Sequence, residues 1–246
     1  VYIWDMDETL ILLRSLLNGT YAEGFNGLKD VQKGIEIGKM WEKHILQVCD
    51  EFFLYERIEN FNKPFLDALS EYDDGKDLSD YDFNTDGFDD SNKRKLAYRF
   101  RLISQKYSQG LHTVLDQEMI KQWDDLYDLT DIYTDRWLSS ARAFLKQQNI
   151  NVLVTSGWLV PSLVKCLLFR LDDFIVYSSW DVGKLQCFSW IKKRFPNTRF
   201  CVIGDGWEEC EAAEAMRWPF VRIDLRPHRF PGLTLRTIGH YLSVVY

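Results

Sequence analysis

Short apolar runs alternate with longer stretches of helical spacing at both ends of this chain. Apolar, β-branched and aromatic runs are typical of buried strands, and they occupy residues 1–4, 151–154, 174–178, 199–203 and 220–224. Apolar residues recur at helical spacing over residues 159–171, 184–195, 207–217 and 233–242. This alternation predicts an α/β fold with a doubly wound parallel sheet, whose ligands bind at the carboxyl ends of the strands.

The middle of the chain has a different pattern. Helical apolar spacing covers residues 31–51, 93–106, 116–129 and 131–148, whereas strand patterns are scarce. Acidic turn residues interrupt these predicted helices between residues 73 and 90. We therefore expect a core made of residues 1–14 and 147–246, with residues 15–146 inserted into it as a helical cap.

Two aspartates follow the first predicted strand. Asp5 and Asp7 are spaced i, i+2, so their side chains point the same way on an extended backbone. Two carboxylates this close repel and desolvate each other unless a cation or a proton separates them. The pair therefore indicates a hard metal ion with a carboxylate nucleophile, or an acid/base pair. A solvated turn is the alternative interpretation of these two residues alone.

Other polar groups follow in a fixed order along the chain. They are Thr155, Ser156 and Gly157 after the second strand, Lys184 at the start of a helix, and Asp205, Glu208 and Glu209 after a later strand. Each group alone is a weak indication of function. Together, at the predicted strand ends and helix starts, they form a specific set.

The ordered set resembles the four motifs of the haloacid dehalogenase superfamily of phosphohydrolases: Asp-x-Asp-x-Thr, a threonine or serine, a lysine, and an acidic cluster. A closer resemblance, spread over nearly the whole chain, is to the Eyes absent phosphatase family. The residues that carry it are 4–10, 15–20, 81–88, 93–99, 135–138, 183–184, 187–188 and 202–206. Arg14 and Cys210 depart from the animal pattern, which favours a plant or otherwise divergent member.

The resemblance implies a mechanism based on an aspartate nucleophile and Mg²⁺. Asp5 attacks the substrate phosphorus and forms an aspartyl-phosphate, while Asp7 protonates the leaving oxygen and later deprotonates the attacking water. Mg²⁺ is held by the Asp5 carboxylate, the Asp7 backbone carbonyl and the Asp205 carboxylate, all hard oxygen ligands. Glu209, or alternatively Glu208, orients water bound to the metal.

The resemblance also assigns groups to the substrate phosphate. Thr155 donates its hydroxyl to a phosphoryl oxygen, and the amides of Ser156 and Gly157 reinforce it at the start of a helix. Lys184 adds a fixed positive charge.

By resemblance, we expect a Mg²⁺-dependent protein tyrosine phosphatase whose substrate is a phosphotyrosine-containing protein. Residue spacing alone supports only phosphomonoester hydrolysis. One alternative is therefore a haloacid dehalogenase phosphatase that acts on phosphoserine, phosphothreonine or a small phosphomonoester. Another is an interaction domain that serves mainly as a transcriptional cofactor, since animal Eyes absent proteins bind homeodomain transcription factors.

Composition narrows the class of protein. The 246 residues carry a net charge of −7 and no long basic run, which argues against direct nucleic-acid binding. No apolar run approaches the roughly 18 residues that cross a bilayer, so we expect no membrane partner. Five cysteines without a C-x-x-C pair favour a reducing compartment, so we expect the cytoplasm, the nucleus or both.

Three observations on residue spacing argue against a thiolate phosphatase, a calcium site and a zinc site. No cysteine has an arginine six positions later, as a thiolate phosphatase requires. Residues 82–93 match the first half of an EF-hand loop, but Lys93 stands where calcium needs a bidentate glutamate. The four histidines lie at no metal-ligand spacing, which argues against zinc. Because a strand begins at Val1, we expect the natural chain to start before it.

Overall fold

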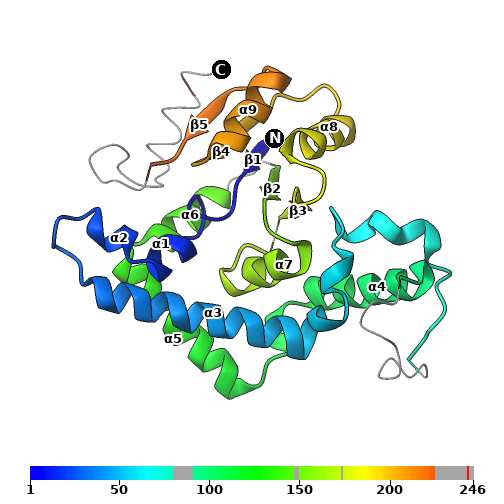
Figure 1. Ribbon diagram of the computed structural model, residues 1–246, viewed down its shortest axis with the longest axis horizontal. Coiled ribbons are helices and arrows are strands. Elements are labelled where there is room, and N and C mark those ends of the chain that lie inside the picture. Colours follow the sequence, from blue (N-terminus) through cyan, green and yellow to red (C-terminus); the bar gives the residue numbers. More distant parts are fainter. Residues whose placement is uncertain (80–90, 147–149, 173, 225–242, 244–246) are drawn as a thin grey trace.

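The computed structural model describes residues 1–79, 91–146, 150–172, 174–224 and 243. At its centre is a five-stranded parallel sheet with the order β3-β2-β1-β4-β5 (Figure 1). The strands are β1 (Tyr2–Trp4), β2 (Asn151–Thr155), β3 (Ile175–Ser178), β4 (Cys201–Gly204) and β5 (Phe220–Arg222). The predicted α/β fold with a doubly wound parallel sheet is confirmed.

Each face of the sheet has its own apolar core. Ile3 lies level with Val152 and Val202 on the neighbouring strands, and all three belong to one core. The next residue, Trp4, faces the opposite core because side chains alternate along a strand. Helices cover both faces, so the strands are apolar on both sides and appear as continuous apolar runs in the sequence.

The described chain between β1 and β2 is helical. Its α-helices are α1 (Leu13–Leu17), α2 (Thr20–Glu23), α3 (Val31–Phe53), α4 (Lys93–Gln109), α5 (Gln117–Tyr133) and α6 (Trp137–Leu145). Its 3₁₀-helices are η1 (Tyr55–Arg57), η2 (Glu59–Phe61), η3 (Leu66–Tyr72) and η4 (Leu111–Thr113). None of the helices within the described ranges is long and apolar enough to cross a membrane.

All these helices contribute to one apolar core on one side of the sheet, which also includes α7 (Leu159–Leu168), the helix after β2. α3 runs below α7 in Figure 1, and the Trp41 ring on α3 lies 4.2 Å from the ring of Phe169. Trp4 of β1 packs edge-on against Phe144 of α6 at 5.3 Å. The apolar core therefore continues from the sheet into α3 and α5. The division into a core and an inserted cap stays a prediction.

The opposite face carries α8 (Lys184–Arg194) and α9 (Trp207–Met216), which lie side by side (Figure 1). They bury Phe188, Ile191 and Ala213 against the sheet. β1 is the central strand, and the strand order reverses there. In a sheet of this kind the reversal opens a crevice at the carboxyl ends of the strands, and the loops after β1, β2 and β4 meet at that edge.

The predicted strands and helices around the sheet are confirmed to within three residues at each end. One boundary in the helical region was wrong. The spacing predicts helices over residues 116–129 and 131–148, but α5 continues to Tyr133 and α6 begins at Trp137. Asp135 and Arg136 have φ values of 54° and 67°, and these left-handed residues end α5. The predicted helix at 233–242 and residues 82–90 of the EF-hand-like motif lie outside the described residues.

A buried aspartate explains where the chain breaks between α5 and α6. Asp131, near the end of α5, accepts hydrogen bonds from the Ser139 amide at 2.9 Å and from the Ser139 hydroxyl. Ser139 lies in the first turn of α6, whose own N-cap residue, Arg136, makes no capping side-chain bond. Asp131 therefore caps the helix that follows its own. Its role depends on tertiary geometry, which residue spacing alone does not show.

Gly38 of α3 is a point of close contact with α1. A Cβ atom at this position would lie 2.8 Å from the backbone nitrogen of Leu17. That neighbour is backbone, so it cannot move aside as the end of a flexible side chain can.

Gly38→Ala is therefore expected to destabilise the protein by about 1–3 kcal/mol through overpacking. The same exchange in an exposed helix normally stabilises by about 0.5–1 kcal/mol. The sign of the change in the free energy of unfolding, measured with urea, therefore distinguishes close packing from open space at Gly38. Lys39→Ala, at the neighbouring exposed position, is the control and should change stability by less than about 0.5 kcal/mol. A Gly38→Ala protein more stable than the wild type would contradict the close packing of α1 on α3.

Candidate active site

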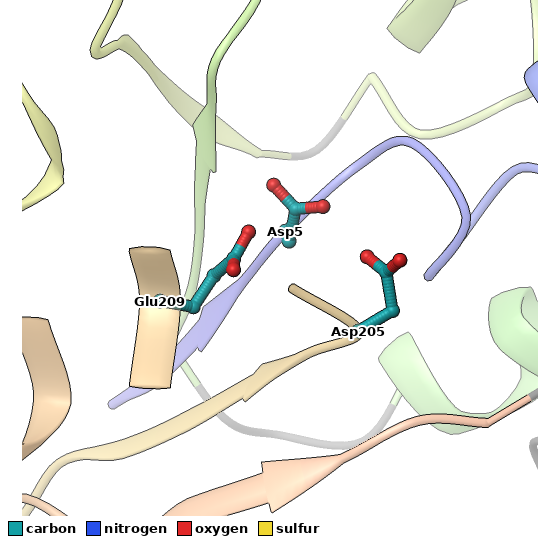
Figure 2. A group of neighbouring side chains, drawn as sticks. All are labelled: Asp5, Asp205 and Glu209. Carbon is teal, nitrogen blue, oxygen red and sulfur yellow. The ribbon is translucent and has the colours of Figure 1, made fainter. Parts of the chain in front are cut away.

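Three carboxylates meet at the carboxyl edge of the sheet (Figure 2). Asp5 follows β1, Asp205 follows β4, and Glu209 lies in the first turn of α9. One oxygen from each carboxylate lies within 4.8 Å of the other two. Asp5 and Glu209 are buried and Asp205 is half-buried. Carboxylates this close and this buried need a cation or a proton between them.

The strand pairing and two glycines bring these carboxylates together. The Asp5 amide donates to the carbonyl of Ile203 at 2.9 Å, which continues the pairing of β1 with β4. A Cβ on Gly204 would lie 3.2 Å from the Cβ of Asp5 and 3.0 Å from the Cγ of Glu209. A Cβ on Gly206 would lie 2.5 Å from Oε2 of Glu209. A side chain at either position would press on the Glu209 carboxylate where it now lies.

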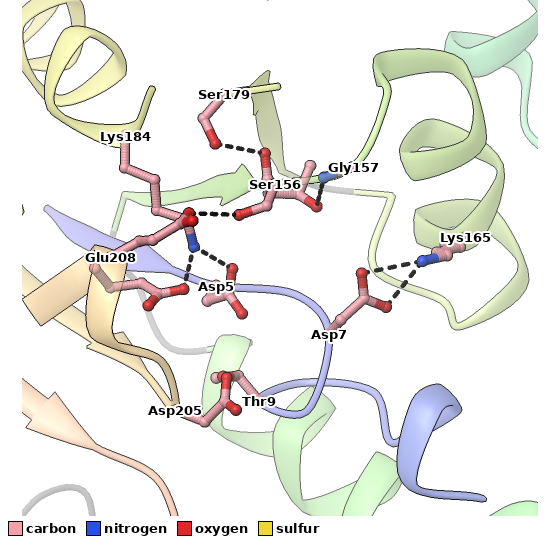
Figure 3. A network of polar contacts seen from close by, with 12 residues as sticks. Asp5, Asp7, Thr9, Ser156, Gly157, Lys165, Ser179, Lys184, Asp205 and Glu208 are labelled. Carbon is pink, nitrogen blue, oxygen red and sulfur yellow. Dashed lines mark hydrogen bonds and ion pairs between the residues drawn. The ribbon is translucent and has the colours of Figure 1, made fainter. Parts of the chain in front are cut away.

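Lys184, at the start of α8, supplies positive charge (Figure 3). Its Nζ donates to Oδ1 of Asp5 at 2.7 Å and to Oε1 of Glu209, and its side chain is only 2% exposed. Burial opposes its charge, but the carboxylates of Asp5 and Glu209 outweigh burial and raise the pKa of Lys184. This lysine is therefore a fixed cation of the site.

One ammonium does not balance three carboxylates. Burial raises the pKa of Asp5 to about 8 against the opposing charge of Lys184, and Glu209 adds to the rise. Burial and the charge of Glu209 also raise the pKa of Asp205. A second cation among the three carboxylates would favour their ionised forms and lower these pKa values.

The carboxylates fit a hard divalent cation. Oε2 of Glu209 is buried and has no hydrogen-bond partner among the described residues, and a buried carboxylate oxygen without a partner is costly. Asp5, Asp205 and Glu209 offer the oxygen ligands that Mg²⁺ prefers, so these three could hold the predicted ion. The Asp7 side chain does not join them, which leaves its backbone carbonyl as the predicted ligand.

Thr155 is the last residue of β2, and Ser156 and Gly157 follow it beside the carboxylates. Thr155 is buried, and its hydroxyl oxygen accepts from the Gly157 amide at 3.0 Å. The hydroxyl hydrogen of Thr155 can therefore be donated to a phosphoryl oxygen. The Gly157 amide is occupied by this bond, although the sequence predicts that it binds phosphate. The Ser156 hydroxyl donates to Oε2 of Glu208 at 3.1 Å (Figure 3).

Asp7 turns away from the other carboxylates toward a lysine that sequence reasoning missed (Figure 3). Nζ of Lys165 on α7 lies 2.8 Å from one carboxylate oxygen of Asp7 and 3.0 Å from the other. Lys165 stands in an apolar helical stretch, and the two residues lie 158 positions apart. A single lysine within an apolar helical stretch indicates a buried ion pair, but the sequence does not show which residue it pairs with.

Thr9 also contributes to the site without having been assigned a role. It is fully buried, and its hydroxyl donates to Oδ1 of Asp205 at 3.4 Å. Its backbone carbonyl accepts from the indole of Trp137 at 3.1 Å. Thr9 therefore connects Asp205 to α6 and orients that carboxylate.

Four of the five cysteines are buried and unsuited to act as a competing nucleophile. Burial raises the pKa of the thiols to about 12 in Cys49, Cys166, Cys187 and Cys201. Thiols of this kind are almost fully protonated near neutral pH and are poor nucleophiles. The carboxylates are therefore the better candidates for the nucleophile.

The chain resembles known proteins over its whole length. It is 62% identical to the protein phosphatase EYA of Arabidopsis thaliana, with 100% of this chain and 90% of that protein aligned. It is 33% identical to the human protein phosphatase EYA2 and 34% identical to the Drosophila melanogaster protein phosphatase eya. The chain spans 50% of the human protein and 33% of the fly protein. No protein-family model matches the chain.

Lys184→Met should destabilise the protein at pH 7.5 by about 3–5 kcal/mol, because it leaves buried carboxylates without their counter-charge. Urea unfolding measures the change. Addition of MgCl₂ should narrow the difference from the wild type, because a divalent cation supplies the missing positive charge.

Lys192→Met, on the exposed side of the same helix, is the matched control and should leave stability nearly unchanged. Equal stability of the Lys184→Met variant and the wild type would show that Lys184 does not compensate the carboxylates.

Proposed function

Because the chain belongs to the Eyes absent (EYA) family of protein phosphatases, we propose that it is a Mg²⁺-dependent protein tyrosine phosphatase with an aspartate nucleophile. The observation that carries the proposal is the buried lysine between the Asp5 and Glu209 carboxylates at the end of the central strand. This arrangement places an anionic nucleophile, Asp5, beside a positive charge, Lys184, that can bind a phosphoryl group.

In the first step, an Asp5 carboxylate oxygen bonds to phosphorus as the bond to the leaving oxygen breaks. Asp7 gives its proton to that leaving oxygen. The Thr155 hydroxyl and the Lys184 ammonium bind phosphoryl oxygens. Mg²⁺ held by the carboxylates of Asp5 and Asp205 and the backbone carbonyl of Asp7, with Glu209 beside it, would supply the charge that lets the anionic nucleophile approach an anionic phosphate.

In the second step, water attacks the phosphorus of the aspartyl-phosphate, and Asp7 accepts a proton from that water. The bond between phosphorus and Asp5 breaks, which releases phosphate and restores the carboxylate. Lys165 stays beside Asp7 throughout. A carboxyl group that loses its proton next to an ammonium gains an ion pair, so Lys165 stabilises the state that follows proton donation.

The names of the relatives support a protein substrate. The choice of phosphotyrosine rests on the family resemblance, and phosphoserine, phosphothreonine and small phosphomonoesters are the competing substrates. Homeodomain transcription factors as partners, and the cytoplasm or nucleus as the compartment, stay predictions.

Asp5→Asn should lower kcat for an aryl phosphate by at least about 10³-fold, because the amide is no nucleophile. EDTA should abolish wild-type turnover, and excess MgCl₂ should restore it. Asp172→Asn, away from the carboxylates in the loop after α7, is the control and should retain activity. Full activity of Asp5→Asn, or turnover in EDTA, would contradict the mechanism.

The same assay distinguishes the substrates. We expect kcat/KM to be higher for a phosphotyrosine peptide than for the matched phosphoserine peptide or a sugar phosphate. A higher value for either of the other two would reassign the substrate without changing the chemistry.

The pairing of Lys165 with Asp7 leads to a prediction about proton transfer to the leaving group. Asp7→Asn should cost about 10²–10⁴-fold on phosphotyrosine, whose leaving phenol has a pKa of about 10. The loss should be smaller on para-nitrophenyl phosphate, whose more acidic phenol leaves without help. Lys165→Met should show the same dependence on the leaving group at a smaller magnitude, and Lys165→Arg should recover much of the rate.

A double-mutant cycle separates this role from a structural one. If Lys165 acts by positioning Asp7, Lys165→Met should have little further effect in the Asp7→Asn background. Additive losses, or equal losses on both leaving groups, would exclude the role.

A further inference from the structure

A groove opens beside the candidate active site, between the start of α8 and one face of α9. It has a volume of about 660 Å³, and Ser156 and Lys184 lie among its lining residues. Its walls include Trp180, Leu185, Glu208, Glu211, Ala212 and Ala215. The groove is therefore continuous with the residues proposed to bind phosphate, and its walls extend beyond them along α9.

One face of α9 shapes this α8–α9 groove. Glu208, Glu211, Ala212 and Ala215 follow the spacing i, i+3, i+4, i+7, so they share one face of the helix. The alanines leave space where larger side chains would fill it, and Leu185 adds apolar surface that is 47% exposed. The result is an apolar trough with carboxylates at its edge.

The charge of the groove is negative. Glu208 and Glu211 are exposed and make no ion pair within the described ranges. The cation among the lining residues is Lys184, and its ammonium is directed to Asp5 and Glu209. Glu208 accepts a hydrogen bond from the Ser156 hydroxyl, but a neutral hydroxyl leaves its charge uncompensated, so both glutamates can still pair with a cation from outside.

Trp180 forms an aromatic wall of the groove. It follows β3, its side chain is 60% exposed, and its ring lies edge-on to Trp158 at 5.8 Å. This contact supports the indole without covering it. An exposed indole face beside carboxylates can bind a cation through both cation–π attraction and ion pairing.

We propose that the α8–α9 groove binds a lysine or arginine side chain of the phosphoprotein substrate, a few residues from the phosphorylated residue. The methylene stem lies over Leu185 and the two alanines, and the cationic head meets Trp180 and Glu211. An extended peptide advances about 3.3 Å per residue, so a nearby residue reaches the groove while the phosphate is at Lys184. The inference rests on the proposed function, because it assumes a phosphorylated protein substrate.

An apolar substrate side chain is the competing occupant. It would remove water from Glu208 and Glu211 without replacing their hydrogen bonds, which is costly. A basic side chain replaces those bonds and neutralises the charge, so the observed chemistry favours it.

The test is an arginine scan of a phosphotyrosine peptide and its phosphoserine counterpart, with one arginine at each position from four before to four after the phosphorylated residue. Arginine at one or two positions should raise kcat/KM by about 5- to 30-fold over alanine. Leucine at those positions should not. Glu211→Lys should remove the preference, or reverse it toward a glutamate peptide, and Trp180→Ala should weaken it.

Glu214→Lys, on the exposed side of α9, is the matched control for the same change of charge and should keep the arginine preference. Turnover of para-nitrophenyl phosphate, which has no peptide to occupy the groove, measures the hydrolysis step alone in each variant. An active enzyme without any arginine preference, with a leucine preference, or with a preference unchanged in Glu211→Lys, would overturn the inference.

An enzyme inactive on every phosphate would contradict the proposed function instead. In that case, fluorescence anisotropy with non-hydrolysable phosphonate peptides still tests the groove. Tighter binding of the arginine peptide that is lost in Glu211→Lys would support the groove, and equal binding of arginine and alanine peptides would overturn it.

Discussion

The ammonium of Lys184 lies between two buried carboxylates, and the geometry of the site depends on this contact. Each charge alone would be expensive to bury, and together they are stable only when geometry and hydrogen bonds are satisfied. Asp5 and Glu209 hold Lys184 in its charged form. The excess negative charge that remains makes the same place attractive to a divalent cation. The electrostatic constraint that orders the site is thus also the basis of its proposed chemistry.

The fold meets this constraint by bringing distant parts of the chain to one edge. β1 is central, so Asp5 has β2 on one side and β4 on the other. Apolar cores on both faces fix the strands, and Gly204 removes the side chain that would separate Asp5 from Glu209. The rigid sheet supplies the precision, and the loops at its carboxyl edge supply the reactive groups.

The sheet and most of its site could be predicted because the signals are local. An apolar run that ends in a polar group identifies both a strand and a candidate residue, as with Asp5 and Asp205. Contacts that depend on tertiary packing could not be predicted this way. The Lys165–Asp7 ion pair joins residues 158 positions apart, and Asp131 caps a helix other than its own. The break between α5 and α6 was misplaced for that reason, since Asp131 resembles a helix start in sequence although it lies within α5.

The claim that Asp5 carries the phosphoryl group is tested most directly by trapping the intermediate. The enzyme is mixed with a phosphotyrosine peptide and Mg²⁺, quenched within milliseconds, reduced with borohydride and digested for mass spectrometry. An acyl phosphate at residue 5 is reduced to homoserine, so we expect homoserine at position 5 in the wild type and none in Asp5→Asn. Homoserine at another carboxylate, or an unmodified Asp5 during rapid turnover, would contradict it.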